Sequence, residues 1–368
     1  LARAWGVNLL CGHASDDVIL NWLPFDHVGS ISDWHIRCIA LGCTLVYAPK
    51  ETVLGRPLQW MELIHRYRVT HSWAPNFAYS LVSAALKNER PGDWDLSCVK
   101  GLLTAGEMIT RTATREFLAG LAPFGLKPSV VRTAFGMAEM GSGVTYHCPQ
   151  DGRSLTFHHI DRTSLGGTLR AADPDDDTAI SFASLGAVIP GMTMRIVDDE
   201  QRVVPQGVAG HLQFSGAAVS PGYFGNTEAN AVFRADGWFE TGDVGFIIDG
   251  EMFLAGRAGA GIIINGANFY NSEIEGIVEQ VDGVTPSFSA ACAVRAAGSD
   301  DQKLAVFFHT TFTADAVLRP LLRAIQMRLT KQLGIKADYL IPVDLDTTPK
   351  TAIGKIQHKR LTTRFQNG

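Results

Sequence analysis

Residues 44–74 read TLVYAPKETVLGRPLQWMELIHRYRVTHSWA and indicate the architecture of the first half of the chain. The run Thr44-Leu45-Val46-Tyr47 is short and apolar, which is typical of a buried strand. The next segment places apolar side chains at the i, i+3, i+4 and i+7 positions of one helical face, at Trp60, Leu63, Ile64 and Tyr67. A second short strand is predicted from Val69 to Ala74. This strand–helix–strand order predicts a largely parallel sheet covered by helices.

Two changes of pattern divide the rest of the chain. From about residue 178, short strands are interrupted by glycine and proline, which predicts a smaller antiparallel β subdomain. After the Gly-rich stretch Gly256 to Gly261, a helix with a Ser272–Glu275 capping box, two strands and a second helix predict a compact α+β module. We therefore predict an α/β fold with a large N-terminal domain, residues 1–257, and a small C-terminal α+β domain, residues 258–368.

The composition excludes several classes of function. The chain has 368 residues, of which 46% are apolar and 19% are charged, and these values are ordinary for a soluble globular protein. A net charge of −5 gives no electrostatic basis for binding nucleic acid or an anionic membrane. No apolar run is long enough to cross a membrane, and the first residues lack the plan of a signal peptide. Those residues resemble the middle of a helix, so we expect the natural protein to extend further at its N-terminus.

The cysteines indicate the compartment. They are scattered without a close Cys-x-x-Cys pair, at Cys11, Cys38, Cys43, Cys98, Cys148 and Cys292. This spacing argues against a zinc site and against a disulfide framework, and it fits a reducing compartment such as the cytoplasm.

Four short segments carry side chains suited to a nucleotide. In Phe135-Gly136-Met137-Ala138-Glu139, after a predicted strand, a ring can stack on a base and a carboxylate can hold Mg²⁺. Thr104-Ala105-Gly106-Glu107 closes an earlier strand. Phe239-Glu240-Thr241-Gly242-Asp243 presents a carboxylate after a turn, and its oxygens can accept hydrogen bonds from a sugar diol. Thr351-Ala352-Ile353-Gly354-Lys355 puts an ammonium on a glycine-tipped loop, which suits negative charge developing at a phosphate or carboxylate.

Taken alone, each segment also has a purely structural interpretation. The Phe135 segment is equally a tight turn with a solvated glutamate, and Thr104–Glu107 is as ambiguous. In Leu23–Gly29, a single histidine such as His27 is more often structural than functional, by about two to one. The sequence contains no Gly-x-Ser-x-Gly and no Gly-x-Gly-x-x-Gly motif, so hydrolase and dehydrogenase interpretations lose their main support.

The order of these segments resembles the adenylate-forming superfamily, which comprises acyl-CoA synthetases, fatty acyl-AMP ligases and the adenylation domains of peptide and polyketide synthetases. Phe135–Glu139 is similar to the family's aromatic-Gly-x-Thr-Glu motif, and Gly210–Gly216 with Pro221-Gly222-Tyr223 is similar to its Gly-Glu-Leu…Gly-Tyr segment. Further matches follow in the same order at Thr241–Asp243, Gly256-Arg257, Asn265-Gly266 through Glu275, and Gly354-Lys355. The resemblance covers nearly the whole chain.

The resemblance implies a role for each matching residue, with ATP and Mg²⁺ as cofactors. The catalytic residue would be Lys355, bridging the substrate carboxylate and the nucleotide, and the metal ligand would be Glu139. The nucleotide-binding residues would be Gly106, Glu107, Phe135, Gly136, Asp243 and Arg257. The acid-binding residues would be Asp26, His27, Phe77 and Met137, and Gly266 would line the thiol tunnel. The small C-terminal domain would rotate between two half-reactions.

The chain departs from the family pattern at three places. The family's phosphate-binding loop, rich in Ser, Thr and Gly, has no counterpart here and would lie upstream of Leu1. Ala138 stands where Thr is usual, which removes a hydroxyl. Ala258-Gly259-Ala260 occupies the region where relatives carry a Lys-Asp hinge pair, although glycines there can still absorb a hinge rotation.

The same segments also indicate which class of acid is activated and which thiol accepts the acyl group. Phe25-Asp26 fits the Phe-Asp pair with which amino-acid activators bind the substrate ammonium, but Leu23-Pro24, His27 and Gly29 match acyl and aryl acid activators better. A non-amino carboxylic acid is therefore favoured. The closest resemblance is to loading adenylation domains of polyketide/nonribosomal assembly lines, whose acceptor is the phosphopantetheine thiol of a carrier protein. A free-standing ligase that uses CoA is the alternative, and a non-catalytic nucleotide-binding scaffold is a second one, which Lys355 opposes.

Overall fold

The computed structural model describes residues 1–89, 91–148, 152–165, 167–174, 176, 179–258, 262–264, 267–295, 302–351 and 356–367. The chain divides into two compact units. The first holds Leu1–Pro174 and Ala179–Ala255, and the second is chiefly Gly256–Gly368. The predicted division after residue 257 falls in the same Gly-rich stretch, and the mobility of the second unit stays a prediction.

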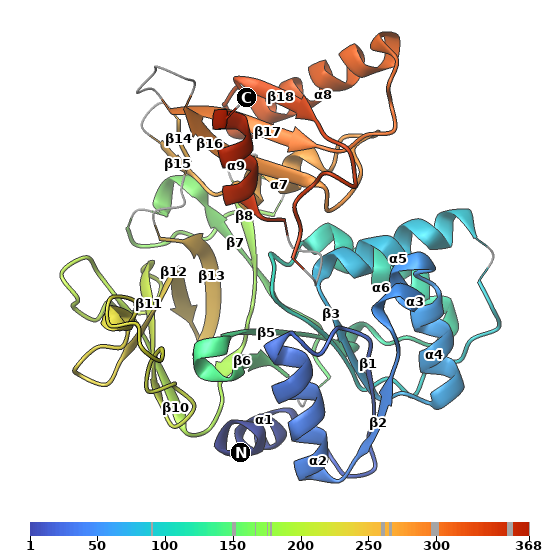
Figure 1. Cartoon of the computed structure of the whole chain (residues 1–368), viewed down its shortest axis with the longest axis vertical. Coiled ribbons are helices and arrows are strands. Elements are labelled where there is room, and N and C mark those ends of the chain that lie inside the picture. Colours follow the sequence, from blue (N-terminus) through green and yellow to red (C-terminus); the bar gives the residue numbers. More distant parts are fainter. Residues whose placement is uncertain are drawn as a thin grey trace. The chain divides into compact units, whose positions relative to one another are not determined.

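A seven-stranded sheet forms the centre of the first unit, in the order β2-β1-β3-β4-β5-β6-β9 (Figure 1). From β2 to β5 the neighbours are parallel, and β6 and β9 add antiparallel strands at one side. The strands are β1 Val18–Asn21, β2 Thr44–Tyr47, β3 His71–Ala74, β4 Gly101–Thr104, β5 Val131–Met137, β6 Ser142–His147 and β9 Ala187–Val188. The predicted α/β fold with a largely parallel sheet is confirmed.

Helices connect these strands and cover the sheet. They are α1 Ala2–Cys11, the π-helical η1 Gly29–Ile36, α2 Arg37–Leu41, α3 Lys50–Gly55, α4 Gln59–Tyr67, α5 Asn76–Asn88 and α6 Arg111–Leu121, with the 3₁₀ turns η2 Ala122–Phe124 and η3 Pro128–Val130. The predicted apolar stripe lies on α4, where Trp60 and Ile64 are fully buried. Tyr67 ends the helix and stays exposed. On the neighbouring helices, Tyr79 of α5 stacks on Phe117 of α6 with ring centroids 4.2 Å apart.

One strand differs from its predicted environment. The run Thr44–Tyr47 does form β2, but Thr44 and Tyr47 are exposed and the two residues between them are half-buried. The prediction of a buried strand was wrong because β2 is the edge of the sheet and pairs only with β1.

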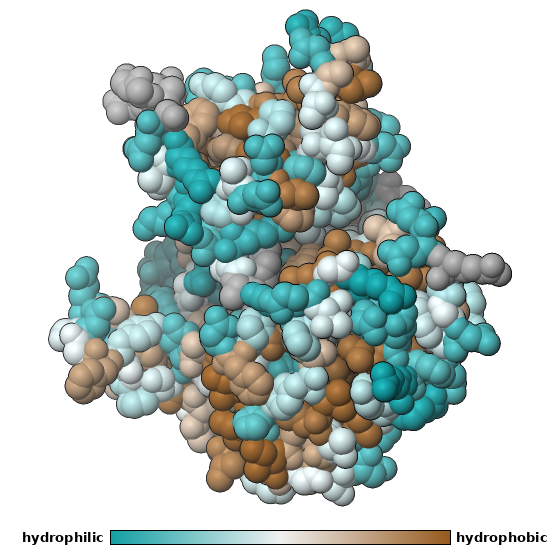
Figure 2. Space-filling model, turned by 45° about the vertical axis from the view of Figure 1, so that its right-hand side comes forward, coloured by the Kyte–Doolittle hydropathy of each residue, from teal (hydrophilic) through white to brown (hydrophobic). Residues whose placement is uncertain are grey.

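Apolar side chains of the first helices reach the surface. Figure 2 shows apolar residues gathered on the lower part of the visible face. Large exposed apolar residues of α1, its N-cap and the η1–α2 segment are Leu1, Trp5, Leu9, Ile31, Ile36 and Ile39. A cluster of this kind is typical of a surface that contacts another part of a protein.

Antiparallel strands form the remainder of the first unit, as predicted. A four-stranded sheet has the order β10-β11-β12-β13, and β7 and β8 form a separate pair. Their bounds are β7 Phe157–Asp161, β8 Ala179–Ala183, β10 Met192–Val197, β11 Gly210–Gly216, β12 Phe239–Ile248 and β13 Glu251–Arg257, with the 3₁₀ turns η5 Arg162–Ser164 and η6 Ala229–Val232. Phe246 stacks on Phe253 with ring centroids 5.1 Å apart, so these strands contribute their own apolar core.

The second unit is an α+β module, as predicted. Its three-stranded sheet has the order β16-β17-β18, and β14 and β15 pair antiparallel as a separate sheet. The elements are β14 Ile262–Ile264, β15 Ala267–Phe269, α7 Asn271–Val278, β16 Ser289–Arg295, β17 Gln302–Phe308, α8 Asp315–Leu333, β18 Tyr339–Pro342 and α9 His358–Asn367. One core cluster joins the apolar faces of α7 and α8 to the sheet, and another joins Leu361 of α9 to Ala290 and Cys292 of β16.

The predicted capping box of α7 was wrong. The helix begins at Asn271 and its N-cap is Tyr270, without a side-chain hydrogen bond. Glu275 instead accepts hydrogen bonds from the backbone N–H of Ala291 at 2.9 Å and from Nε2 of His358 at 2.5 Å. This carboxylate contacts β16 and α9 instead of the backbone at the start of its own helix.

The expectation that the cysteines form no disulfide was also wrong for one pair. Cys11 at the end of α1 is bonded to Cys148 after β6, and their Cα atoms are 5.1 Å apart. The two residues are 137 positions apart, so no sequence spacing could show the pairing. Cys38, Cys43, Cys98 and Cys292 are free. Among the residues that the structure describes, no helix has both the length and the apolar character needed to span a membrane.

Candidate active site

The structure brings several predicted residues to one edge of the parallel sheet. His27 follows β1, Glu107 follows β4, and Glu139 lies in the 3₁₀ turn η4 (Ala138–Met140) after β5. Because β1, β4 and β5 run in the same direction, their carboxyl ends lie at the same edge. Open α/β sheets bind their ligands at this edge. Phe135, Gly136 and Met137 belong to β5 itself, which continues further than predicted.

His27 is held in one orientation. Its Nδ1 accepts a hydrogen bond from the backbone N–H of Gly29 at 3.1 Å, so the proton of the neutral ring is on Nε2. The ring centroid lies 5.4 Å from that of Trp73. Burial lowers the pKa of His27 below its ordinary value, although Asp26 and Asp33 act in the opposite direction. The imidazole is therefore neutral at pH 7 and can donate from Nε2.

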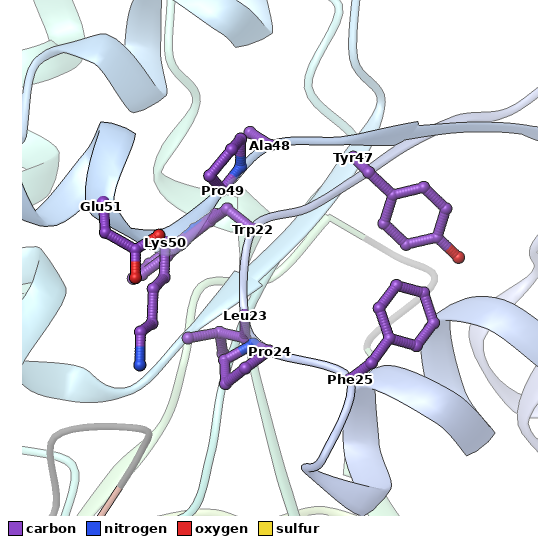
Figure 3. A pocket seen from close by; sticks show the side chains of 9 residues that line it. All are labelled: Trp22, Leu23, Pro24, Phe25, Tyr47, Ala48, Pro49, Lys50 and Glu51. Carbon is purple, nitrogen blue, oxygen red and sulfur yellow. The ribbon is translucent and has the colours of Figure 1, made fainter.

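A pocket of about 350 Å³ opens between the carboxyl ends of β1 and β2. Its lining residues are Trp22, Leu23, Pro24, Phe25, Tyr47, Ala48, Pro49, Lys50 and Glu51. Figure 3 shows the Phe25 and Tyr47 rings next to each other on one side and Lys50 on the other, and the two ring centroids are 4.8 Å apart. None of the predicted substrate residues lines it, and Asp26 is exposed.

Glu107 is fixed against the start of α5. Its Oε1 accepts a hydrogen bond from the backbone N–H of Phe77 at 2.5 Å. A carboxylate is favourable there because the N-terminus of a helix carries partial positive charge. The Phe77 ring itself is buried, and it is the backbone N–H of Phe77 that contacts Glu107. The preceding Gly106 has φ of 88°, and a Cβ there would meet nothing within 4 Å, so open space lies beside it.

Phe135 and Gly136 are constrained by the strands around them. Phe135 is buried, and one face of its ring lies on Phe214, with centroids 5.9 Å apart and an interplanar angle of 17°. A Cβ on Gly136 would overlap the backbone oxygen of Ser142, so only glycine allows β6 to approach β5 here. Met137 pairs with Ser142 and is half-buried.

Glu139 is anchored on both its backbone and its side chain. Its Oε1 accepts a hydrogen bond from the hydroxyl of Tyr223 at 2.5 Å, and its carbonyl accepts one from the N–H of Ser220 at 2.7 Å. The hydrogen bond to Glu139 raises the pKa of Tyr223 above its ordinary value. Tyr223 lies in the segment that resembles the family's Gly-Tyr motif, but the sequence did not reveal its contact with Glu139.

Mg²⁺ fits this site as an ion held mainly by nucleotide phosphates. Protein-bound Mg²⁺ typically uses one or two carboxylates together with phosphate oxygens and water. Glu139 supplies one carboxylate. Over the described ranges, no group of three or more His, Cys, Asp or Glu side chains is placed to hold a metal ion by itself.

Asp243 lies at an irregular position within β12, where the pairing with β11 shifts register between His211 and Gln213. Its backbone N–H donates to Oγ1 of Thr241 at 3.0 Å, and that hydroxyl donates to the carbonyl of Leu212 at 2.9 Å. Gly242 between them has φ of 72°, which favours glycine. Asp243 is only 5% exposed, so its position is set by the protein before any ligand binds.

The remaining predicted residues belong to the second unit. Arg257 is exposed at the end of β13. Lys355, Gly266 and the Gly259-Ala260 part of the altered hinge region lie outside the described residues. Their roles stay predictions.

Comparison with known proteins identifies the family. The family described as AMP-binding enzyme matches residues 2–224, which is more than half of the chain. The chain belongs to the AMP-binding enzyme family. Its predicted membership of the adenylate-forming superfamily is confirmed.

Relatives of this AMP-binding chain include biosynthetic synthetases. Atromentin synthetase invA1 from Paxillus involutus is 31% identical over 382 residues, which cover 100% of this chain and 38% of that protein. A keto acid-selecting NRPS module, solved with adenylation, ketoreductase and pseudo Asub domains, is 37% identical with a TM-score of 0.91 and covers 100% of this chain and 31% of that one. McyG A-PCP, complexed with phenylalanyl-adenylate, is 35% identical with a TM-score of 0.85 and covers 100% and 62%. The chain thus spans less than two thirds of each.

Proposed function

We propose that this chain activates a carboxylic acid as its acyl-AMP at the carboxyl edge of the parallel sheet. The proposal depends on one observation, the joint placement of Glu107, Phe135 and Glu139 at that edge in a member of the AMP-binding family. A carboxylate oxygen of the acid attacks the α-phosphorus of ATP. The bond from that phosphorus to the bridging oxygen breaks, and pyrophosphate leaves.

The chain's residues would bind and orient ATP. Adenine would lie against Phe135 and Gly136, beside the open space at Gly106 and the fixed carboxylate of Glu107. The carboxylate of Asp243 would accept hydrogen bonds from the ribose hydroxyls, with Arg257 as the second ribose residue. Because Asp243 is buried and its backbone N–H is hydrogen-bonded, ribose binding would cost this residue little conformational entropy.

Two positive charges would offset the charge that develops during the reaction. Glu139 would hold Mg²⁺, which neutralises phosphate charge when it is bound. Lys355 would place its ammonium between the acid and the α-phosphate. Both groups act where two anions must approach each other, and a positive charge there offsets their repulsion.

We propose that the acid is a non-amino acid of the keto, aryl or acyl type. An amino acid needs a carboxylate facing its ammonium, whereas Asp26, the residue predicted for that role, is exposed. The neutral His27 can donate from Nε2 to an uncharged carbonyl or ether oxygen. The keto acid-selecting relative supports this choice, and the relative with phenylalanyl-adenylate makes an amino acid the outcome to exclude.

The second proposed step passes the acyl group to the phosphopantetheine thiol of a carrier protein. The thiol loses its proton and its sulfur attacks the acyl carbonyl; the bond to AMP breaks and a thioester forms. Gly266 would line the approach of the thiol, and the second unit would rotate to open it. The A-PCP relative supports a carrier as acceptor, with CoA as the alternative.

ATP–pyrophosphate exchange with the full natural polypeptide tests the proposal. The acids would be an aromatic 2-oxo acid, an aryl carboxylate, a medium-chain fatty acid and phenylalanine, with Lys355→Ala as control. We expect exchange with at least one non-amino acid and a loss of about a hundredfold or more in the control, the scale of one preorganised electrostatic group. Exchange with phenylalanine alone would contradict the acid class. No exchange with any of the acids would favour a non-catalytic scaffold, and thioester formation with CoA but not with a holo-carrier would favour the free-standing ligase.

A further inference from the structure

The carboxylate of Asp33 is buried in the first unit and accepts hydrogen bonds on both oxygens. Its Oδ1 accepts from Nη1 of Arg3 at 2.7 Å and from the hydroxyl of Tyr146 at 2.8 Å. Its Oδ2 accepts from the hydroxyl of Ser142 and, at 3.5 Å, from the backbone N–H of Gly143. Donors come from α1 and β6, while Asp33 itself lies in η1, so three separate segments meet at this one side chain.

This carboxylate remains ionised although it is buried. Burial alone would raise the pKa of Asp33, but the charges of Arg3 and Arg37 and the hydrogen bond from Ser142 bring it below the ordinary value. Hydrogen bonds to an ionised acceptor are stronger than those between neutral groups. The bond from Ser142 to Asp33 is therefore one of the stronger links between η1 and β6.

Ser142 has a backbone conformation that serine rarely adopts. Its φ is 138°, and Gly141 before it has φ of 72°. A non-glycine residue in such a conformation is strained and persists only where its surroundings hold it. The hydroxyl bond to Asp33 is such a restraint. Only Gly141 separates Ser142 from η4, so Ser142 fixes one end of the turn that carries Glu139.

The other end of the link is the segment Leu23–Gly29, called here the His27 segment. The carbonyl of His27 accepts a hydrogen bond from the N–H of Ile31 in η1 at 3.3 Å, and the hydroxyl of Ser30 in η1 donates to the carbonyl of Leu23 at 3.2 Å. The turn that carries His27 is therefore tied to the helix that carries Asp33. No other element is needed to connect the predicted acid-binding histidine with the predicted metal carboxylate.

We propose that Asp33, acting through Ser142, is a positioning residue that holds the Glu139 turn in register with the His27 segment. The inference rests on the proposed function, because it concerns residues of that site. Asp33 itself does not contact the reacting groups. Its effect is to keep the metal-binding turn and the acid-binding turn at a constant separation while ATP and acid are bound.

Two substitutions of Ser142 separate the hydrogen bond from the backbone strain. Ser142→Ala removes the hydroxyl and keeps the strained conformation, whereas Ser142→Gly removes the hydroxyl and relieves the strain. Ser32→Ala is the matched control, since Ser32 is also in η1 and accepts from Nη2 of Arg3 at 2.9 Å, and its loss leaves the bond from Ser142 to Asp33 in place. Asp33→Asn removes the charge and completes a double-mutant cycle with Ser142→Ala.

Kinetics of pyrophosphate exchange give the first readout. We expect both Ser142 variants to lower kcat about tenfold or more, the scale of one hydrogen bond to a charged group, and to need more Mg²⁺ for half-maximal exchange. KM for the acid should change less than about twofold. Asp33→Asn also removes the charged partner of the buried Arg3, so its own effect should be the larger, but Ser142→Ala should cost much less in the Asp33→Asn background than in the wild type, because the link is then already broken. Ser32→Ala should behave as wild type. Wild-type kcat and Mg²⁺ dependence in both Ser142 variants would overturn the inference while leaving the proposed function intact.

Hydrogen exchange gives a second readout that needs no activity. In Ser142→Ala we expect faster amide exchange both in the Glu139 turn and in the His27 segment, and in Ser32→Ala no change in the Glu139 turn. If the wild type shows no pyrophosphate exchange, the proposed function fails, but this experiment still decides the link. Unchanged amide exchange in both segments of Ser142→Ala would overturn it.

Discussion

The bond between Cys11 and Cys148 leads to a quantitative stability prediction. It joins the end of α1 to the residue after β6 and closes a sequence separation of 137 residues. A chain-entropy estimate for a loop of that length is about 5 kcal/mol at 25 °C, and measured contributions of disulfides are typically about 2–4 kcal/mol. We therefore expect Cys11→Ser to lower the free energy of unfolding of the first unit by about 2–5 kcal/mol.

Urea denaturation followed by tryptophan fluorescence measures this change. All seven tryptophans lie in the first unit, so the signal reports the unfolding of that unit alone. Cys98→Ser is the matched control, because Cys98 is a free, half-buried thiol of the same unit. It should change the free energy of unfolding by less than about 1 kcal/mol. Adding a reductant should shift the wild-type curve onto that of Cys11→Ser.

Thiol titration decides the point independently. Without reductant, the unfolded wild type should expose four reactive thiols, since two of its six cysteines are bonded. Six reactive thiols, together with a denaturation curve that reductant does not move, would show that Cys11 and Cys148 are not bonded.

Three further predictions concern packing, backbone contact and charge. Phe117→Ala removes a fully buried ring stacked on Tyr79 and should lower the free energy of unfolding by about 3–5 kcal/mol in the same urea assay; a loss below about 1 kcal/mol would contradict this packing. Gly136→Ala forces the backbones at Ser142 apart and should reduce pyrophosphate exchange about a hundredfold, with the circular dichroism spectrum retained; full activity would show that the β5–β6 contact is not needed. Burial is the main reason why the pKa of His71 in the folded state lies below the unfolded value of about 6.5. The unfolded state therefore binds more protons, and the free energy of unfolding should decrease as the pH is lowered through about 6.5. His71→Gln should flatten this dependence between about pH 7.5 and 5.5, and equal slopes in the two proteins would count against it.

The parts of the fold that depend on local spacing could be predicted from the sequence. The stripe around Trp60 and the apolar runs of β1 and β3 express the periods of a helix and a strand, which neighbouring residues carry. The burial of β2 could not be predicted, because it depends on which strand lies beside it. The start of α7 could not be predicted either, since Glu275 found partners in β16 and α9 that no local pattern records.

In the candidate site, too, some residues could be predicted from the sequence and others could not. Glu139 and Asp243 stand in short motifs with characteristic spacing, so the sequence was enough to propose them. The partners that hold such residues come from distant segments. Tyr223 contacts Glu139 from 84 positions away, and Ser142 contacts Asp33 from 109 positions away. No local pattern in the sequence marks Asp33, and one sequence cannot name its donors.

A crystal structure of the natural polypeptide with a non-hydrolysable acyl-AMP analogue would show where the nucleotide binds. We expect adenine against Phe135 and Gly136 and both ribose hydroxyls within hydrogen-bond distance of the Asp243 carboxylate. An analogue bound away from these three residues, for example in the pocket beside Phe25 and Tyr47, would contradict this expectation.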